Sequence, residues 1–303
     1  MVLKRIFLAL SFLIGISIAL ISHAVRADVL FEGYSKVLSG GVPIGYSIAR
    51  YEFDNKKKQF IATTFLKTNE LGGNLTESLK AYSTDDMKPV SYQYTTLVGN
   101  QTKIIDAKFE KGKMFANVTD GKKVEKIQKE IPKGTFLSSF LAYVMLRSPT
   151  GFKADTKYDF QAIAEEEAGI FKGVAFIKTP EDYNGLKAFR VLNEFKGSKF
   201  ISLVSDKGEV FSTKAPVQGV ATELVAKPTE ATANFPIPSA VLKNLFGEVP
   251  TGQMNELSKF VNKNPGDLKK QGIPPGKGIQ VKGSPAPAPS PSSAPVPKDA
   301  NGE

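Results

Sequence analysis

The chain is 303 residues long, with a formal net charge of +10, no Cys, no Trp and a single His. That histidine, His23, lies in an N-terminal stretch that has the features of a targeting signal. The folded part of the chain is therefore expected to contain neither a thiol nor an imidazole. This excludes zinc sites built from Cys and His, and nucleophiles of the Ser-His-Asp and Cys-His types. No metal site and no cofactor is predicted.

A signal peptide is predicted at residues 1–27. An apolar run over residues 6–21 follows Lys4 and Arg5, and Ala27 is a small residue suited to the last position before cleavage. The run is short for a membrane span, which needs about 20 apolar residues, so cleavage is favoured and retention as an anchor helix is the alternative. No Cys follows the run, which excludes a lipid attached through a thioether. The predicted location is periplasmic.

Alternation with a period of two dominates residues 28–233, as in the segments 60–66, 90–96 and 102–109, which are rich in aromatic and β-branched residues. Short turn sequences such as Asn184-Gly185 separate such segments and favour hairpins. We predict a mainly β domain of about ten to twelve strands, joined in chain order as an antiparallel meander. So many strands should curl into a barrel or half-barrel.

One apolar segment breaks this pattern and predicts a helix over residues 135–147. Thr135 suits the first turn, Arg147 suits the last turn, and Pro149 prevents continuation. Because apolar residues cover nearly all of its faces, this helix should pack against the concave face of the sheet. A structural plug is one interpretation, and the other is that the helix lines a cavity for a lipid-like ligand. The candidate ligand-binding residues are Phe136, Leu137, Phe140, Leu141 and Val144.

Short helices that pack on the β domain are predicted within residues 234–262. One covers residues 240–246, between Ser239 and Gly247, and another covers residues 254–261. From residue 263 to residue 303 the chain becomes rich in Pro, Ala and Ser, which predicts a disordered, semi-extended tail.

Several motifs occur in an order that resembles a known family. They are the turn Gly40-Gly41 before Ile44-Gly45, the segment from Asp85 to Tyr92, the apolar helix, the turn Asn184-Gly185 and the hairpin Asp206-Lys207-Gly208. This order resembles the bacterial envelope proteins of domain of unknown function 3108, and it also looks like the region before transglutaminase-like domains in some envelope proteins. The resemblance implies a curved antiparallel sheet similar to that of periplasmic lipoprotein carriers. The chain departs from the family at Asp86, where a Gly often precedes the proline turn, and no catalytic residue is implied.

No catalytic residue is predicted from the residues themselves either. Glu165, Glu166 and Glu167 form the densest acidic run, but neighbouring strand residues alternate between faces, so a solvated turn is the favoured interpretation. No Ser-x-x-Lys sequence occurs in the chain. The lysines are spread through turns and strand edges without a stripe of aromatic partners, which argues against nucleic acid.

The leading hypothesis is an exported, non-enzymatic envelope protein whose curved sheet binds an apolar or amphipathic ligand, such as a lipid or a lipidated partner. The basic surface would favour an anionic head group or envelope polymer, and membrane contact would be peripheral at most. The alternative is a structural or protein-interaction module of the cell envelope that reaches a protein partner through its Pro-rich tail.

Overall fold

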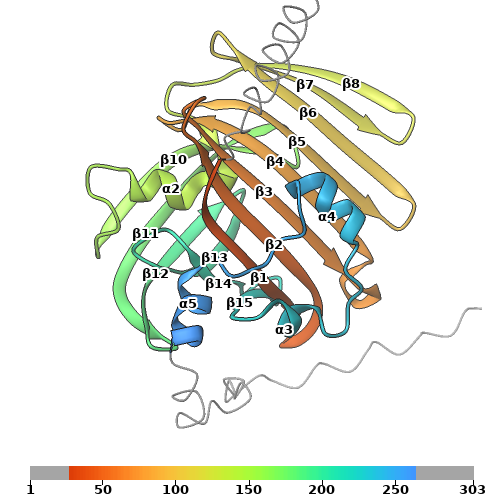
Figure 1. Cartoon of the computed structure of the whole chain (residues 1–303). Helices are drawn as coiled ribbons and strands as arrows, with labels where there is room; N and C mark the ends of the chain where they lie inside the picture. Colours follow the sequence, from red (N-terminus) through yellow and green to blue (C-terminus); the bar gives the residue numbers. More distant parts are fainter. Residues whose placement is uncertain (1–26, 264–303) are drawn as a thin grey trace, which may run out of the picture. The chain divides into compact units, whose positions relative to one another are not determined.

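A single curved sheet of fifteen strands forms the body of the computed structural model, which describes residues 27–263 (Figure 1). The first eight strands are β1 (Asp28–Ser39), β2 (Val42–Asp54), β3 (Gln59–Thr68), β4 (Leu75–Thr84), β5 (Pro89–Val98), β6 (Gln101–Glu110), β7 (Lys113–Asp120) and β8 (Lys123–Glu130). The other seven are β9 (Phe136–Leu137), β10 (Thr156–Ala164), β11 (Gly169–Tyr183), β12 (Leu186–Phe195), β13 (Ser198–Val204), β14 (Val210–Ala215) and β15 (Val220–Val225).

The strands form two meanders that meet in the middle of the sheet. In space the order runs from β8 to β1 and then from β15 to β9. Strand β15 pairs with β1 from Tyr34↔Val225 to Ser39↔Val220. We call β1–β8 the N-terminal half-sheet and β9–β15 the C-terminal half-sheet. Neighbouring strands are antiparallel except β9 and β10, and the sheet is open, with β8 and β9 at its two ends. The predicted fold class is confirmed, although the predicted number of strands was too low.

Tight turns join the strands within each meander. At several two-residue turns both central residues have positive φ, which is the geometry that matches the twist of paired strands. These turns are Gly40-Gly41, Lys111-Gly112, Asn184-Gly185 and Lys196-Gly197. The turn sequences recognised in the chain therefore set the hairpins as expected.

The two faces of the sheet carry different helices. We call the face that packs against α2 (Leu141–Leu146) the inner face and the opposite one the outer face. On α2, Tyr143 packs with Phe60 of the N-terminal half-sheet, whereas Met145 packs with Ile177 and Phe189 of the C-terminal half-sheet. One short helix therefore joins the apolar cores of both half-sheets, as the predicted position against the concave face requires.

The helix predicted over residues 135–147 is shorter than expected. Phe136 and Leu137 form β9, which pairs in parallel with Ala162 and Ile163, and a 3-10 turn, η2 (Ser138–Phe140), precedes α2. The expected cap at Thr135 is not made, because its buried hydroxyl has no hydrogen-bond partner in the structure. Pairing with β10, which is distant in sequence, overrides the helical tendency of the first residues.

Three helices follow the last strand, α3 (Pro228–Thr232), α4 (Ser239–Phe246) and α5 (Glu256–Lys263). Leu242 and Phe246 of α4 pack on the outer face against Tyr46 and Phe65, whereas Leu257 of α5 packs against inner-face residues such as Phe31 and Leu224. Both predicted C-terminal helices exist, and α3 was not anticipated. The short turn η1 (Glu70–Gly72) connects β3 to β4.

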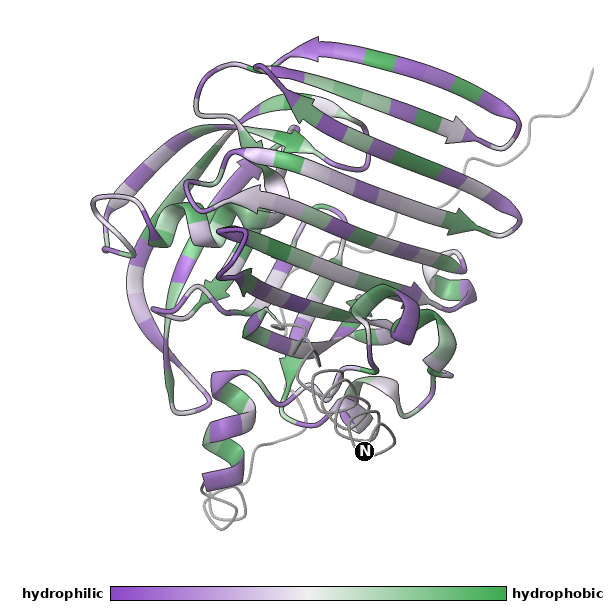
Figure 2. Ribbon diagram, turned by 45° about the horizontal axis from the view of Figure 1, so that its top comes forward, coloured by the Kyte–Doolittle hydropathy of each residue, from purple (hydrophilic) through white to green (hydrophobic). Residues whose placement is uncertain are grey.

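Alternation of hydrophilic and hydrophobic residues is visible along the strands, with the edge strand β8 mostly hydrophilic (Figure 2). Among residues 27–263, none of the helices has the length and apolar content needed to cross a bilayer. The predicted signal peptide and Pro-rich tail lie outside the described residues, apart from Ala27 and Lys263 at their borders.

Candidate functional site

Three of the five candidate ligand-binding residues meet in one groove. Phe136, Leu141 and Val144 line it together with residues of β10 and β11, and we call it the α2 groove. The other two candidates lie elsewhere, since Leu137 and Phe140 are fully buried in the inner core. Those two side chains do not line the groove and are not open to a ligand.

The α2 groove has a volume of about 630 Å³, within the range of about 300–1,000 Å³ that is usual for small-molecule sites. Its floor is apolar, and its rim is polar. The floor is formed by Phe136, Leu141, Val144, Met145, Tyr158, Phe160 and Gly173, and the rim by Lys133, Gly134, Asp159, Gln161 and Lys172.

The groove exists because β10 is left partly uncovered. Strand β9 pairs with only Ala162 and Ile163, so residues 156–161 of β10 have no strand on that side among residues 27–263. On the other side of β10, Gly173 faces Phe160, and a Cβ at Gly173 would lie 2.4 Å from the Phe160 ring. The missing side chain lets this ring lie flat in the floor, where its centroid is 5.6 Å from that of Phe136.

The charges at the rim are unequal. Asp159 forms an ion pair of 2.8 Å with Lys157. Lys133 and Lys172 are exposed and have no carboxylate partner in the part of the chain that the structure describes. The rim is therefore cationic above an apolar floor.

Tyr158, which lines the groove, is bonded to the loop after α2. The hydroxyl of Tyr158 donates to the carbonyl of Gly151 at 2.6 Å and lies 2.9 Å from the hydroxyl of Ser148. The hydroxyl of Ser148 also lies 3.2 Å from that of Thr150. These bonds hold the loop against β10 and fix the position of the Tyr158 hydroxyl.

A second hollow, of about 320 Å³, lies on the inner face beneath η2. Its polar lining includes Glu77, Tyr94, Ser138, Ser139 and Glu165. Glu165 is only 3% exposed and accepts hydrogen bonds from the Ser138 hydroxyl at 2.5 Å and the Ser139 amide at 3.1 Å. Burial raises the pKa of Glu165 above its ordinary value.

Only Glu165 of the acidic run 165–167 departs from the predicted solvated turn, since Glu166 and Glu167 lie in the β10–β11 turn with 41% and 48% of their side chains exposed. Glu165 points into the core, and Glu166 and Glu167 both form ion pairs with Lys196, the latter at 2.5 Å. These contacts bind the β10–β11 turn to η2 on one side and to the β12–β13 turn on the other. The three acids thus have structural partners, and no general acid–base pair across a cleft is formed by them.

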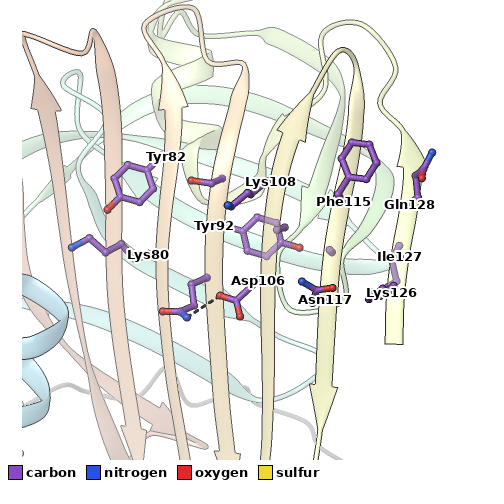
Figure 3. Close-up of a pocket in the computed structure, with 14 residues that line it drawn as sticks. Lys80, Tyr82, Tyr92, Asp106, Lys108, Phe115, Asn117, Lys126, Ile127 and Gln128 are labelled. Atoms are coloured by element: carbon purple, nitrogen blue, oxygen red, sulfur yellow. Dashed lines mark hydrogen bonds between the residues drawn. The ribbon is translucent and has the colours of Figure 1, made fainter. Parts of the chain in front are cut away.

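A third hollow lies on the outer face of β4–β8 and has a volume of about 790 Å³ (Figure 3). Most of the residues that line it are of polar types, and we call it the outer groove. Its side chains form rows across the strands, one of which includes Lys80, Gln93 and Asp106. None of these residues was singled out from the sequence, because each is an ordinary solvent-facing residue of a strand until the register brings the row together.

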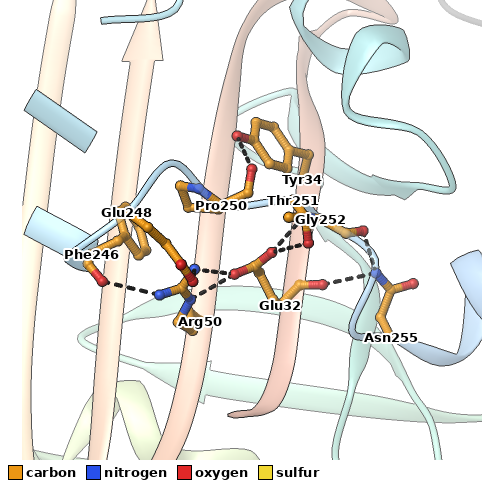
Figure 4. Close-up of polar contacts among 9 residues, drawn as sticks. All are labelled: Glu32, Tyr34, Arg50, Phe246, Glu248, Pro250, Thr251, Gly252 and Asn255. Atoms are coloured by element: carbon orange, nitrogen blue, oxygen red, sulfur yellow. Dashed lines mark hydrogen bonds and ion pairs between the residues drawn. The ribbon is translucent and has the colours of Figure 1, made fainter. Parts of the chain in front are cut away.

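A buried polar cluster connects the middle of the sheet to the segment between α4 and α5. Arg50, 1% exposed, donates to Glu32 at 2.6 Å and to the carbonyl of Phe246 at 3.0 Å (Figure 4). The other oxygen of Glu32 accepts from the hydroxyl of Thr251 at 3.0 Å and from the amide of Gly252 at 2.6 Å. Since both charges are satisfied by the chain itself, this cluster anchors the segment between α4 and α5 and offers no free group to a ligand.

Within residues 27–263, no group of three or more acidic, His or Cys side chains is placed to hold a metal ion. No protein-family model matches the chain, and no curated protein matches it significantly. The resemblance to domain of unknown function 3108 therefore stays a resemblance of motif order.

Among solved structures, the chain is similar to a β-barrel-like protein of domain of unknown function 1849 from Brucella abortus. The similarity has a TM-score of 0.46 at 13% identity and covers 66% of this chain and 97% of that one. A similarity of this degree assigns no function.

Proposed function

We propose that this protein is a non-enzymatic binding protein for an amphipathic ligand with an anionic head group, held in the α2 groove. The observation that carries the proposal is the combination of an apolar floor with two unpaired rim lysines in one groove of about 630 Å³. With the export signal expected from the sequence, the natural ligands would be envelope lipids or the acyl chain of a lipidated partner. Contact with the membrane would be peripheral.

The apolar floor should supply most of the affinity. Burial of apolar surface contributes about 25 cal/mol per Å², so an acyl chain that covers Val144, Leu141 and Phe160 gains several kcal/mol. Exposed ion pairs contribute only about 0.2–1 kcal/mol each. Lys133 and Lys172 would therefore select the head group and add little to the total affinity.

Oleate and methyl oleate test this division, because they differ only in the charge of the head group. Binding to the full chain can be followed by native mass spectrometry and by displacement of anilinonaphthalene sulfonate. Val144→Lys places a charge in the floor and should weaken oleate binding at least about tenfold. Val241→Lys, at an exposed position of α4, is the matched control and should leave binding unchanged.

The rim is tested separately by Lys133→Glu combined with Lys172→Glu. This variant should weaken the binding of oleate and leave that of methyl oleate nearly unchanged, whereas Lys243→Glu on α4 should affect neither. Both rim positions are exposed, so folding is expected to survive even if Val144→Lys unfolds the protein. Equal oleate binding by the folded groove variants and their controls would overturn the proposal.

A further inference from the structure

The outer groove is built from two rows of side chains that run across five strands. Direct cross-strand pairing places Lys80, Gln93, Asp106, Asn117 and Lys126 in one row. The same pairing places Tyr82, Ser91, Lys108, Phe115 and Gln128 in the neighbouring row. Neighbouring strands are about 4.8 Å apart, so each row offers a polar or aromatic group at regular intervals over about 19 Å.

This surface is open to solvent where the outer helices end. The ammonium group of Lys80 donates to the carbonyl of Leu245 in α4 at 3.1 Å, which marks the border of the covered area. Beyond it Gln93, Asp106, Lys108 and Asn117 are exposed. Figure 3 shows the side chains of Asp106, Lys108 and Asn117 on β6 and β7. The register and the bond between the Gln93 amide and the Asp106 carboxylate, at 2.8 Å, hold the row in order.

Phe115 is the apolar exception in this polar surface. Its side chain is 42% exposed, whereas its neighbours Met114 and Ala116 on the inner face are buried. The inner core therefore does not need Phe115, and no outer helix covers it. A ring in the row between Lys108 and Gln128 provides a platform on which a flat, weakly polar group can stack.

The charges of the groove favour an anion. Three lysines, Lys80, Lys108 and Lys126, face a single acidic residue, Asp106, among the residues that line it. Lys108 and Lys126 have no ion-pair partner among the described residues. An anionic ligand would supply the missing countercharge.

Two other classes of ligand fit this surface poorly. A peptide that adds a strand needs unpaired backbone groups, and β5, β6 and β7 are each paired on both sides. A lipid needs a continuous apolar floor, which the alternating amide, hydroxyl and charged side chains do not provide. Hydroxyl groups at regular spacing, ring faces with apolar patches and scattered negative charges are the features of an acidic polysaccharide.

We propose that the outer groove binds an extended acidic glycan, which lies across β4–β8 with its hydroxyl groups on the amide and carboxylate row, a sugar ring on Phe115 and its carboxylates near Lys108 and Lys126. This site is on the face opposite the inner core and is independent of the α2 groove. An exported protein with both sites would connect a carbohydrate polymer to an amphipathic ligand.

Polygalacturonate and its fully methyl-esterified form are suitable probes, since they share a backbone and differ in charge. Affinity electrophoresis and calorimetry with the full chain should show binding of the acid form, weakened by added salt, and at least about tenfold weaker binding of the ester. Lys108→Glu should lower the affinity for polygalacturonate about tenfold, and Phe115→Ala about fivefold.

Matched controls lie outside the groove on the same half-sheet. Leu97→Ala removes an exposed apolar side chain of β5, and Lys122→Glu reverses a charge in the β7–β8 turn. Neither should change the affinity. The proposal is overturned if the groove variants bind polygalacturonate as the controls do, if no glycan binds, or if single-stranded oligothymidylate binds more tightly. All four variants should bind oleate as the unchanged protein does. A negative result with glycans would therefore leave the proposed role of the α2 groove untouched.

Discussion

Both ends of the sheet have a strand edge whose unpaired backbone groups can pair with another chain, and the two edges differ in the side chains around them. Strand β8 is a full-length edge with exposed side chains, and Lys123, Glu125, Lys126 and Lys129 make it unfavourable for pairing with another chain. At the other end, β9 covers only two residues of β10, and the rest of that edge faces an apolar groove. The charged end disfavours pairing with another strand, and the open apolar end is the site proposed for the amphipathic ligand.

The ends also differ in how they are held. The β8 end is held by a continuous ladder of strands and by inner-face packing. The β9 end depends on α2, whose Met145 lies within the core of the C-terminal half-sheet. Between the ends, the Glu32–Arg50 pair fixes the middle of the sheet to the segment after α4.

The largest effect is expected from Arg50→Met, which should destabilise both ends alike. Removal of one partner of a buried ion pair costs about 3–5 kcal/mol, and the buried Glu32 would remain without its cation. Urea unfolding measures the loss. Arg190→Met, which breaks the exposed pair with Glu181, should cost no more than about 1 kcal/mol. Equal losses in the two variants would contradict the role assigned to the buried pair.

Met145→Ala should destabilise the β9 end of the sheet and leave the stability of the β8 end unchanged. Truncation of a buried methionine costs about 2–5 kcal/mol, and the cavity would lie against β11–β13. Hydrogen exchange should become faster in β10–β13 and remain slow in β5–β7. Met254→Ala, at an exposed position, should change neither region. Uniform acceleration across the whole sheet would show that the ends are not held independently.

A smaller effect is expected on the pH dependence of folding stability, through Glu209 in the turn before β14. Burial raises the pKa of Glu209 to about 7 from an ordinary value of 4.5. The folded state then binds more protons than the unfolded state between about pH 4.5 and pH 7, so its stability falls as the pH rises through that range.

Glu209→Gln should remove this dependence, which amounts to about 2–3 kcal/mol between pH 5 and pH 8. Melting temperatures at both pH values provide the measurement, and Glu194→Gln, at an exposed position of β12, is the control. An unchanged pH profile in Glu209→Gln would mean that this carboxyl is ionised at its ordinary pH.

The smallest effect on stability is expected at the β8 edge. Lys123→Val together with Glu125→Val should change the free energy of unfolding by no more than about 0.5 kcal/mol, because both side chains are exposed. Sedimentation should nevertheless show concentration-dependent self-association, since the charges that block edge pairing are gone. The control variant, Lys153→Val with Glu230→Val, lies away from the β8 edge and should sediment as the unchanged protein does.

Period-two alternation and glycine turns were sufficient to predict the hairpins, because these signals are local. The division into two meanders depends on the pairing of β1 with β15, which is distant in sequence and was not predicted. Strand β8 carries no such signal, because both of its faces meet solvent and it has no alternation to recognise. The helix was drawn too long because two distant partners, β10 and Glu165, hold its first residues in other conformations.

Several residues of the α2 groove could not be predicted from the sequence, because they also depend on pairing between distant strands. Phe160 and Lys172 come to Phe136 only through the pairing of β9, β10 and β11. Gly173, opposite Phe160, is the one local sign of a space there.

The pairing of β1 with β15 has a consequence for synthesis. Tyr34 meets Val225, so the middle of the sheet cannot form until nearly the whole domain has been made, whereas each hairpin can form early. Until then β1 has an open edge, and the N-terminal half-sheet is incomplete. If the chain is exported as its first residues suggest, this late closure would keep it in a form that a translocation channel can still thread.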